Sequence, residues 1–174
     1  MMRKLSMDEL NRLDINQFKN AQKIPLIVVL DNIRSLSNIG SVFRTADAFL
    51  VEAVWLCGIT AKPPHREIHK TALGSTESVE WKYYDTTKEA VMELRKLGYK
   101  IIGIEQTDKS VLLSEFESEA KTAIIFGNEV EGVENEIVDL CDTCVEIPQH
   151  GTKHSLNVSV CAGIVIWHCF RQME

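Results

Sequence analysis

The 174-residue sequence lacks the features that mark several common classes of protein. It has no apolar run long enough to cross a bilayer and no charged-then-apolar leader, so we expect a cytoplasmic protein without membrane contact. It has no GxxxxGK loop followed by Ser or Thr, no GxGxxG after a strand, no GxSxG elbow and no HExxH spacing. These absences argue against ATP hydrolysis, an ordinary Rossmann dinucleotide site, a serine hydrolase and a metal centre.

Cysteine is present in an odd number, and the five cysteines are scattered through apolar segments. This pattern predicts reduced, buried thiols rather than a disulfide framework. Cys141 and Cys144 have CxxC spacing, but no second pair accompanies them, which argues against a zinc or redox site. The length and the 45% apolar fraction predict one domain with a full hydrophobic core.

The formal net charge of −6 argues mildly against binding to nucleic acid. Basic residues nevertheless gather in two places, one near the start of the chain and one in the segment 62–70. A local basic patch can override the overall charge, although both groups are also compatible with a solvated surface.

Short apolar runs alternate along the chain with segments of helical periodicity. We expect strands at residues 26–30, 53–57, 79–84, 100–104, 123–126 and 145–147. We expect helices at residues 7–22, 39–50, 86–97, 133–140 and 155–171, and a loop at residues 60–78. The alternation predicts an α/β fold, a mainly parallel sheet with helices on both faces. Residues 25–174 then form the domain, and residues 1–24 form an N-terminal helical extension.

Polar residues follow three of these strands, in the segments 38–44, 127–129 and 155–157. The carboxyl ends of strands are where an α/β sheet places its ligands, so these junctions are candidate site residues. Arg44 suits a phosphate or a carboxylate, and Glu129 can orient a basic side chain. A surface arginine and a solvated acidic loop are the structural alternatives.

Asn38 is a suitable N-cap for the helix after the first strand. The helix after the third junction carries a stripe that we expect to face the core, made of Leu156, Val160, Gly163, Ile164 and Trp167.

In this order, the three junctions resemble the three motifs of the SpoU (TrmH-type) RNA 2′-O-ribose methyltransferase family, in the SPOUT superfamily. Asn38-Ile-Gly-Ser-Val-Phe-Arg44 is similar to the first motif and Phe126-Gly-Asn-Glu129-Val-Glu-Gly132 to the second. Ile147-Pro-Gln, followed by Ser155-Leu-Asn157-Val, is similar to the third. The resemblance covers nearly the whole chain after residue 25. It implies a SPOUT-type α/β knot, with a C-terminal trefoil, and a homodimer with the active site at the subunit interface.

The resemblance also implies a reaction, in which S-adenosylmethionine donates a methyl group to a ribose 2′-hydroxyl of RNA without a metal. The implied cofactor-binding residues are Ile104, Glu105, Gly127, Ile147, Leu156 and Asn157. The implied catalytic residues are Arg44, Asn38, Glu129, Ser155 and Asn157. Because a guanidinium is essentially never deprotonated in a protein, we expect Arg44 to stabilise the developing alkoxide and to grip a phosphate.

The segments 102–107 and 144–149 are most similar to enzymes that methylate the D-loop guanosine ribose of tRNA. Ribosomal RNA is the alternative substrate, and an RNA-binding knot protein without catalysis is a second alternative. The residues expected to contact RNA are Arg12, Lys19, Lys23, Arg66, Lys70 and Lys153. Contacts of this kind with phosphates make binding sensitive to salt.

Overall fold

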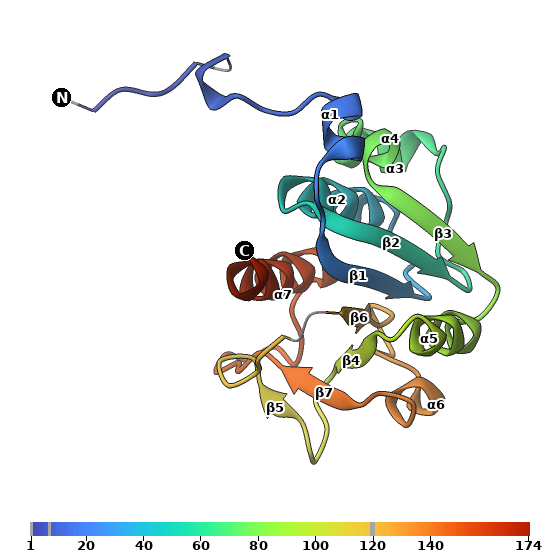
Figure 1. Ribbon diagram of the computed structural model, residues 1–174. Coiled ribbons are helices and arrows are strands. Elements are labelled where there is room, and N and C mark those ends of the chain that lie inside the picture. The colour runs from blue at the N-terminus through green and yellow to red at the C-terminus, as the bar shows by residue number, and fades with distance from the viewer. Residues whose placement is uncertain (1, 7, 119–120) are drawn as a thin grey trace.

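A computed structural model describes residues 2–6, 8–118 and 121–174. Within these residues, seven strands form one sheet in the order β3-β2-β1-β6-β4-β7-β5 (Figure 1). The strands are β1 Ile24–Asp31, β2 Val51–Cys57, β3 Glu80–Tyr84, β4 Lys100–Ile104, β5 Val111–Leu112, β6 Thr122–Phe126 and β7 Thr143–Glu146. Every pairing between neighbouring strands is parallel, which confirms the predicted sheet. The two-residue strand β5 was not predicted, because so short a segment carries no periodicity.

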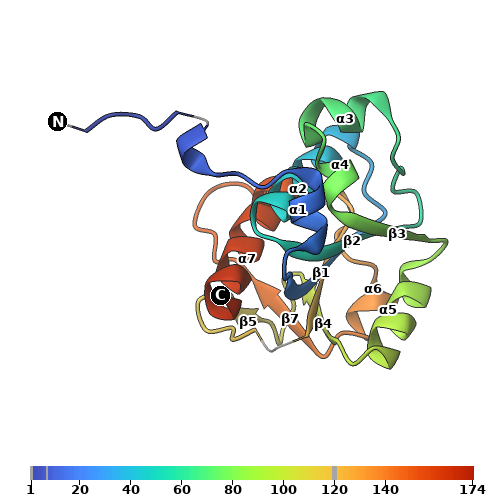
Figure 2. The same cartoon turned by 45° about the horizontal axis from the view of Figure 1, so that its top comes forward.

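Helices cover both faces of the sheet, as predicted (Figures 1 and 2). They are α1 Ile15–Asn20, α2 Leu36–Ala48, α3 Arg66–Ala72, α4 Ser75–Ser78, α5 Thr87–Lys96, α6 Asn135–Val138 and α7 Val158–Met173. One core cluster lies between the sheet and the helices α2, α3 and α7, and the other lies under α5 and α6. Residues 26–30 of β1 are almost fully buried between the two layers. Among the described helices, none has the length and apolarity that crossing a membrane requires.

The segment 60–78, predicted to be a loop, contains the helices α3 and α4, so that prediction was wrong. The ring nitrogen Nδ1 of His65 accepts a hydrogen bond from the backbone N–H of Glu67 at 3.2 Å and caps α3. Leu73 and Gly74 then have φ of 50° and 92°, in the left-handed region that ends a helix. Helices of seven and four residues are too short to display the apolar period that identifies longer ones.

The helix predicted at residues 7–22 is also shorter in the structure. Residue 7 lies outside the described residues, a 3₁₀ turn spans Asp8–Leu10, and α1 begins only at Ile15. The carboxylate of Asp14 accepts the backbone N–H of Gln17 at 2.8 Å, in a capping box that fixes this start. The helix predicted at residues 133–140 is likewise reduced to the four residues of α6.

Two predictions about the helices beside the junctions were wrong. The N-cap of α2 is Ser35 rather than Asn38, which is the third residue of the helix. The predicted core stripe of α7 faces outward, with Val160, Ile164 and Trp167 exposed by 53%, 39% and 47%. The buried face is made of Val158, Ala162, Val165, Ile166 and Cys169. Apolar residues occur on both faces of α7, so their spacing does not identify the face that packs on the sheet.

Gly40 allows α2 and α3 to pack closely. A Cβ atom at this position would lie 2.1 Å from Thr71 Oγ1 and 2.3 Å from the backbone oxygen of Ile68. The Thr71 hydroxyl donates to the Ser37 carbonyl at 3.0 Å and ties α3 to the first turn of α2. The position of the first junction therefore depends on a contact between two helices that only glycine permits.

The substitution Gly40→Ala should destabilise the protein, because a backbone oxygen cannot move aside as a flexible side chain can. We expect the free energy of unfolding, measured with urea, to fall by about 2–3 kcal/mol. Ser41→Ala, on the same helix, is the control and should change it by less than about 0.5 kcal/mol. Equal stability of the Gly40 variant and the wild type would contradict this account of the contact.

Candidate active site

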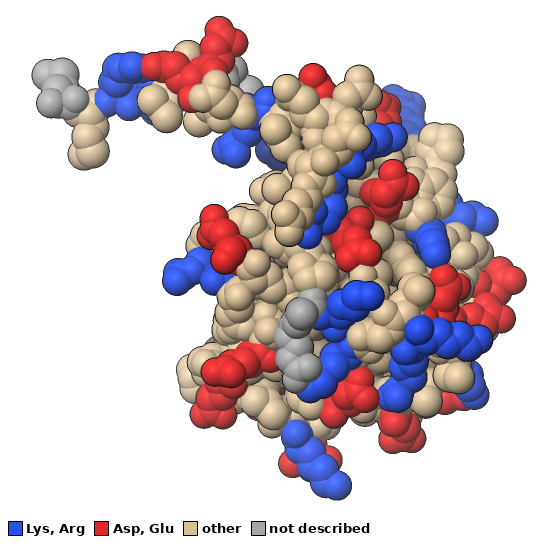
Figure 3. Space-filling view, in the orientation of Figure 1, with Lys and Arg blue, Asp and Glu red and all other residues tan. Residues whose placement is uncertain are grey.

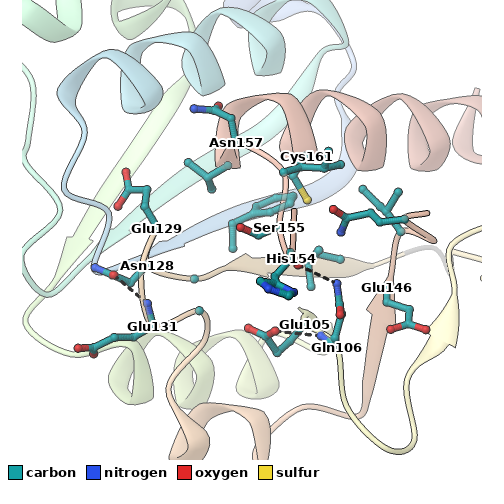
Figure 4. A pocket seen from close by; sticks show the side chains of 18 of the residues that line it. Glu105, Gln106, Asn128, Glu129, Glu131, Glu146, His154, Ser155, Asn157 and Cys161 are labelled. Atoms are coloured by element: carbon teal, nitrogen blue, oxygen red, sulfur yellow. Dashed lines mark hydrogen bonds between the residues drawn. The ribbon is translucent and has the colours of Figure 1, made fainter. Parts of the chain in front are cut away.

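A cavity of about 480 Å³ lies at the carboxyl ends of β4, β6 and β7 (Figure 4). It is lined by residues from the ends of these strands, from the turn 127–132 and from the segment 154–161 at the start of α7. The predicted cofactor-binding residues all line it: Ile104, Glu105, Gly127, Ile147, Leu156 and Asn157. Glu129 and Ser155, predicted to be catalytic, line the same cavity.

A chain of hydrogen bonds joins the three junctions to one another. The amide nitrogen of Asn38 donates to Glu129 Oε1 at 3.2 Å, and its amide oxygen accepts from Asn157 Nδ2 at 3.2 Å. Asn38 is only 8% exposed, so its amide lies largely out of water between its two partners. Three segments that are far apart in the sequence are therefore held together by side chains that the motifs contain.

Glu129 also binds the backbone that precedes α2. Its two carboxylate oxygens accept from the N–H groups of Arg34 and Ser35, both at 3.0 Å. Burial by itself would raise the pKa of Glu129, but these backbone N–H groups, with the Asn38 amide, outweigh it and hold the pKa below its usual range. The side chain is thus a fixed carboxylate that aligns the first junction with the second.

The turn 127–132 brings Glu129 to this position, and close backbone approach shapes the turn. A Cβ on Gly127 would lie 2.1 Å from Gly132 C, and one on Gly132 would lie 2.2 Å from Glu105 Oε2. The amide oxygen of Asn128 accepts the backbone N–H of Val130 at 2.9 Å, inside the turn. Glu105 Oε2 accepts the N–H of Val133 at 3.0 Å and anchors the far end of the turn to β4. Glycine is required at both positions because another backbone or side chain occupies the space.

Asn157 is the N-cap of α7. Its amide oxygen accepts from the backbone N–H of Ser159 at 2.9 Å and from the Ser159 hydroxyl at 2.7 Å. The cap satisfies N–H groups that the first turn leaves free, and it fixes the side chain so that Nδ2 points at Asn38. The same contacts that start α7 therefore orient a residue of the site.

Arg44 is not at this cavity within one chain. It is exposed on α2 and lines a separate cavity of about 290 Å³, formed by residues of α1, α2 and the segment 72–78. It is six positions beyond Asn38, which places it on a different side of α2. Four of the five predicted catalytic residues are thus brought together, and the arginine is not.

Of the predicted RNA contacts, Lys23 has a structural use. Its ammonium donates to the carbonyl oxygens of Phe18 and Ala21 and lies 4.5 Å from the centre of the Phe18 ring. Burial lowers the pKa of Lys23. The other predicted RNA contacts are exposed: Arg12, Lys19, Arg66, Lys70 and Lys153. On the face drawn in Figure 3, basic side chains are interspersed with acidic ones.

The sequence analysis missed several residues that line the cavity, namely Gln106, Asn128, Glu131, Glu146, His154 and Cys161. Gln106 Nε2 donates to the backbone oxygen of His154 at 3.3 Å and links β4 to the loop before α7 (Figure 4). Gln106 and Asn128 each adjoin a residue that was predicted, so their position after a strand was the available signal. Cys161 is four residues beyond Asn157, on the same side of α7.

A parallel α/β sheet with a polar cavity at its carboxyl edge is the architecture of an α/β ligand-binding protein or enzyme. The chain belongs to the SpoU rRNA Methylase family, whose model matches residues 25–167. The motif resemblance found in the sequence is thereby confirmed.

Three similar proteins illustrate the relation. A tRNA (guanosine(18)-2′-O)-methyltransferase of Aquifex aeolicus is 32% identical over 150 residues, which are 86% of this chain and 70% of that protein. The 23S rRNA (guanosine-2′-O-)-methyltransferase RlmB of Neisseria meningitidis is 33% identical over 154 residues, 88% of this chain and 61% of that one. The structure of the SpoU methyltransferase AviRb from Streptomyces viridochromogenes, in complex with the cofactor AdoMet, matches with a TM-score of 0.78 and 26% identity. That match covers 88% of this chain and 62% of the AviRb chain.

The depressed pKa of Glu129 predicts how its contribution to stability depends on pH. A carboxyl whose pKa is lower in the folded state stabilises the fold at pH values above its unfolded pKa of about 4.5. This contribution to stability is lost as the pH falls through the pKa of the folded state. We expect the free energy of unfolding of wild type to exceed that of Glu129→Gln by about 1 kcal/mol at neutral pH, a modest amount because the carboxylate is partly exposed. This difference should shrink below pH 4.5. Urea titrations at successive pH values measure this, with Glu131→Gln in the same turn as the control. A gap independent of pH would contradict the assignment.

Proposed function

We propose that this protein transfers a methyl group from S-adenosylmethionine to a ribose 2′-hydroxyl of RNA, and that the RNA is tRNA methylated at a D-loop guanosine. The family, and the names of relatives that methylate guanosine 2′-hydroxyls in tRNA and in 23S rRNA, support the reaction. The observation that carries the proposal is that hydrogen bonds join residues of all three motifs beside one cavity. A cytoplasmic location follows from the RNA substrate and is part of the proposal.

The cavity has the charge that this cofactor requires. Four carboxylates line it, Glu105, Glu129, Glu131 and Glu146, and no Lys or Arg is among the described residues of its wall (Figure 4). Such a wall disfavours a cofactor with several phosphates and favours one that carries a sulfonium and an ammonium. The apolar side chains of Ile104, Ile147 and Leu156 suit an adenine ring, and about 480 Å³ is within the range of small-molecule sites.

S-adenosylmethionine supplies an electrophilic methyl carbon, so the protein has to position the hydroxyl and manage its negative charge. Asn38 and Asn157 present amide groups whose orientations are fixed by Glu129 and by the cap of α7. Arg44 stabilises the developing alkoxide and holds a neighbouring phosphate, while the hydroxyl proton passes to a phosphate oxygen or to water.

A homodimer explains how an arginine remote from the cavity takes part. The outward face of α7 exposes Val160, Ile164 and Trp167, and Leu156 at the start of the helix is 37% exposed. An apolar stripe of this kind on one helix is typical of a protein contact. In the proposed dimer, two copies pair through this stripe, and Arg44 on α2 of one subunit acts at the cavity of its partner.

Removing Arg44 separates catalysis from cofactor binding. We expect Arg44→Ala to lower kcat for methyl transfer to RNA by about 10²–10³-fold, because the alkoxide loses its cation. The Kd for S-adenosylmethionine should stay within about twofold, since the arginine serves the acceptor. Radiolabelled methyl transfer and calorimetry measure the two quantities.

The control is Lys96→Ala, which removes an exposed cation on α5, on the other face of the sheet. The RNA in the assay comes from cells that lack the protein, and nucleoside analysis of the tRNA and rRNA fractions identifies the product. Label in a 2′-O-methylnucleoside of rRNA alone would favour the ribosomal substrate. Transfer by neither wild type nor variant would favour an RNA-binding protein without catalysis.

Charge on the exposed face of α7 should dissociate the dimer. We expect wild type to be dimeric by light scattering at micromolar concentration and Ile164→Asp to be monomeric, because a buried unpaired carboxylate is costly. The variant should also lose methyl transfer, since the arginine no longer reaches a cavity. Ile59→Asp, which changes an isoleucine that is 62% exposed elsewhere, should leave the dimer intact. A fully active wild-type monomer would rule out the shared site.

A further inference from the structure

A second cavity, also of about 480 Å³, lies outside the proposed active site. Its walls come from the segment 63–69, from α4 and from the start of β3, and they include His65, Arg66, His69, Glu77 and Trp81. Figure 2 shows α3 and α4 side by side above β3, on the side of the sheet that α2 covers. Neither the cofactor nor Arg44 uses this cavity in the proposed reaction.

Trp81 gives the cavity an aromatic wall. It lies on the edge strand β3, opposite Val54 of β2, and it packs partly buried against the core beneath α2 and α3. Tyr83, two residues on and on the same side of the strand, is already covered by the ammonium of Lys62, 4.0 Å from its ring centre. A half-buried tryptophan beside an open volume is a surface on which a nucleobase stacks.

The polar groups of the cavity suit the edge of a base and its phosphate. Glu77 is an exposed carboxylate, and Arg66 is an exposed guanidinium. Nδ1 of His65 accepts a backbone N–H, so a proton on the neutral ring is carried by Nε2, which is then a donor. A carboxylate accepts two parallel hydrogen bonds, and guanine, through N1–H and the 2-amino group, is the RNA base with two adjacent donors on its Watson–Crick edge.

The cavity adjoins the one that Arg44 lines. Both include residues of α4: Ser75 and Ser78 face the Arg44 cavity, and Thr76 and Glu77 face the cavity with Trp81. One four-residue helix therefore separates the two. A ligand in the cavity with Trp81 would therefore be close to a ribose phosphate bound at Arg44.

We propose that this cavity binds an unpaired guanine of the substrate RNA, close in sequence to the methylated nucleotide. Trp81 stacks on the base, Glu77 accepts from its N1–H and amino groups, and Arg66 contacts its phosphate. This proposal rests on the proposed function, since it makes the cavity a specificity site for the same RNA. It assigns sequence recognition to a part of the chain that is separate from the chemistry.

The test uses fluorescently labelled pentaribonucleotides, UUGUU and UUUUU, whose binding to the full-length protein is followed by anisotropy. Wild type should bind UUGUU about fivefold more tightly than UUUUU, and Glu77→Gln should abolish this preference. Trp81→Leu, which keeps apolar volume but removes the ring, should weaken binding of both by about tenfold. Glu80→Gln, an exposed neighbour of Trp81 outside the cavity wall, is the matched control and should behave as wild type.

Methyl transfer distinguishes failure of this proposal from failure of the proposed function. Both cavity variants should raise KM for RNA from cells that lack the protein while their Kd for S-adenosylmethionine stays that of wild type. Wild-type transfer together with unchanged KM and unchanged pentamer binding in both variants would overturn the cavity proposal alone. A guanine preference that Glu77→Gln retains would also overturn it. Absence of transfer by wild type, with guanine-dependent pentamer binding, would overturn the methyl-transfer function and leave the base site standing.

Discussion

The amide of Asn38, held between Glu129 and Asn157, is the contact on which the geometry of the site depends. Its nitrogen donates to one partner and its oxygen accepts from the other, so its orientation is fixed in a nearly buried position. A buried polar group is costly when it lacks a partner, and each of these three side chains satisfies another. The sheet brings the junctions to one edge, and these hydrogen bonds set the positions of the junctions relative to one another.

The fold was predictable from the sequence where a residue pattern had one physical meaning. Continuous apolar runs such as 26–30 occur where both faces of a strand are covered, and all of the predicted strands are present. The convergence of the junctions followed from the parallel order of those strands. Patterns with two physical meanings led to wrong predictions. Asn38 has a side chain that can cap a helix, but Ser35 is the N-cap of α2. The Asn38 amide instead accepts a hydrogen bond from Asn157, 119 residues further along the chain. Sequence spacing cannot distinguish these uses, because both place a polar side chain in the first turns of α2.

The apolar residues of α7 were misassigned for a related reason. A helix with apolar side chains on two faces is compatible with either face toward the sheet, and periodicity reports only that two stripes exist. In the structure, the face that contains the fully buried Ala162 packs against the core and α2. The helices α3 and α4 were missed for a different reason, because they are too short to display an apolar stripe, and α3 is positioned by the His65 cap and by its contact with Gly40.

The two requirements of methyl transfer are separated in the molecule. The carboxylates of the first cavity suit a cationic donor, whereas Arg44 and Arg66 lie at two other cavities and suit the phosphates of an acceptor. In the proposed function, these are two halves of one site, and within a single chain they are not in contact. Helix α7 connects them: its buried face packs on α2, its N-cap orients Asn38, and its exposed stripe is available to a second copy. In the proposed dimer, that stripe belongs to the same helix whose N-cap is Asn157, so pairing of the subunits would act on the element that orients the amide pair.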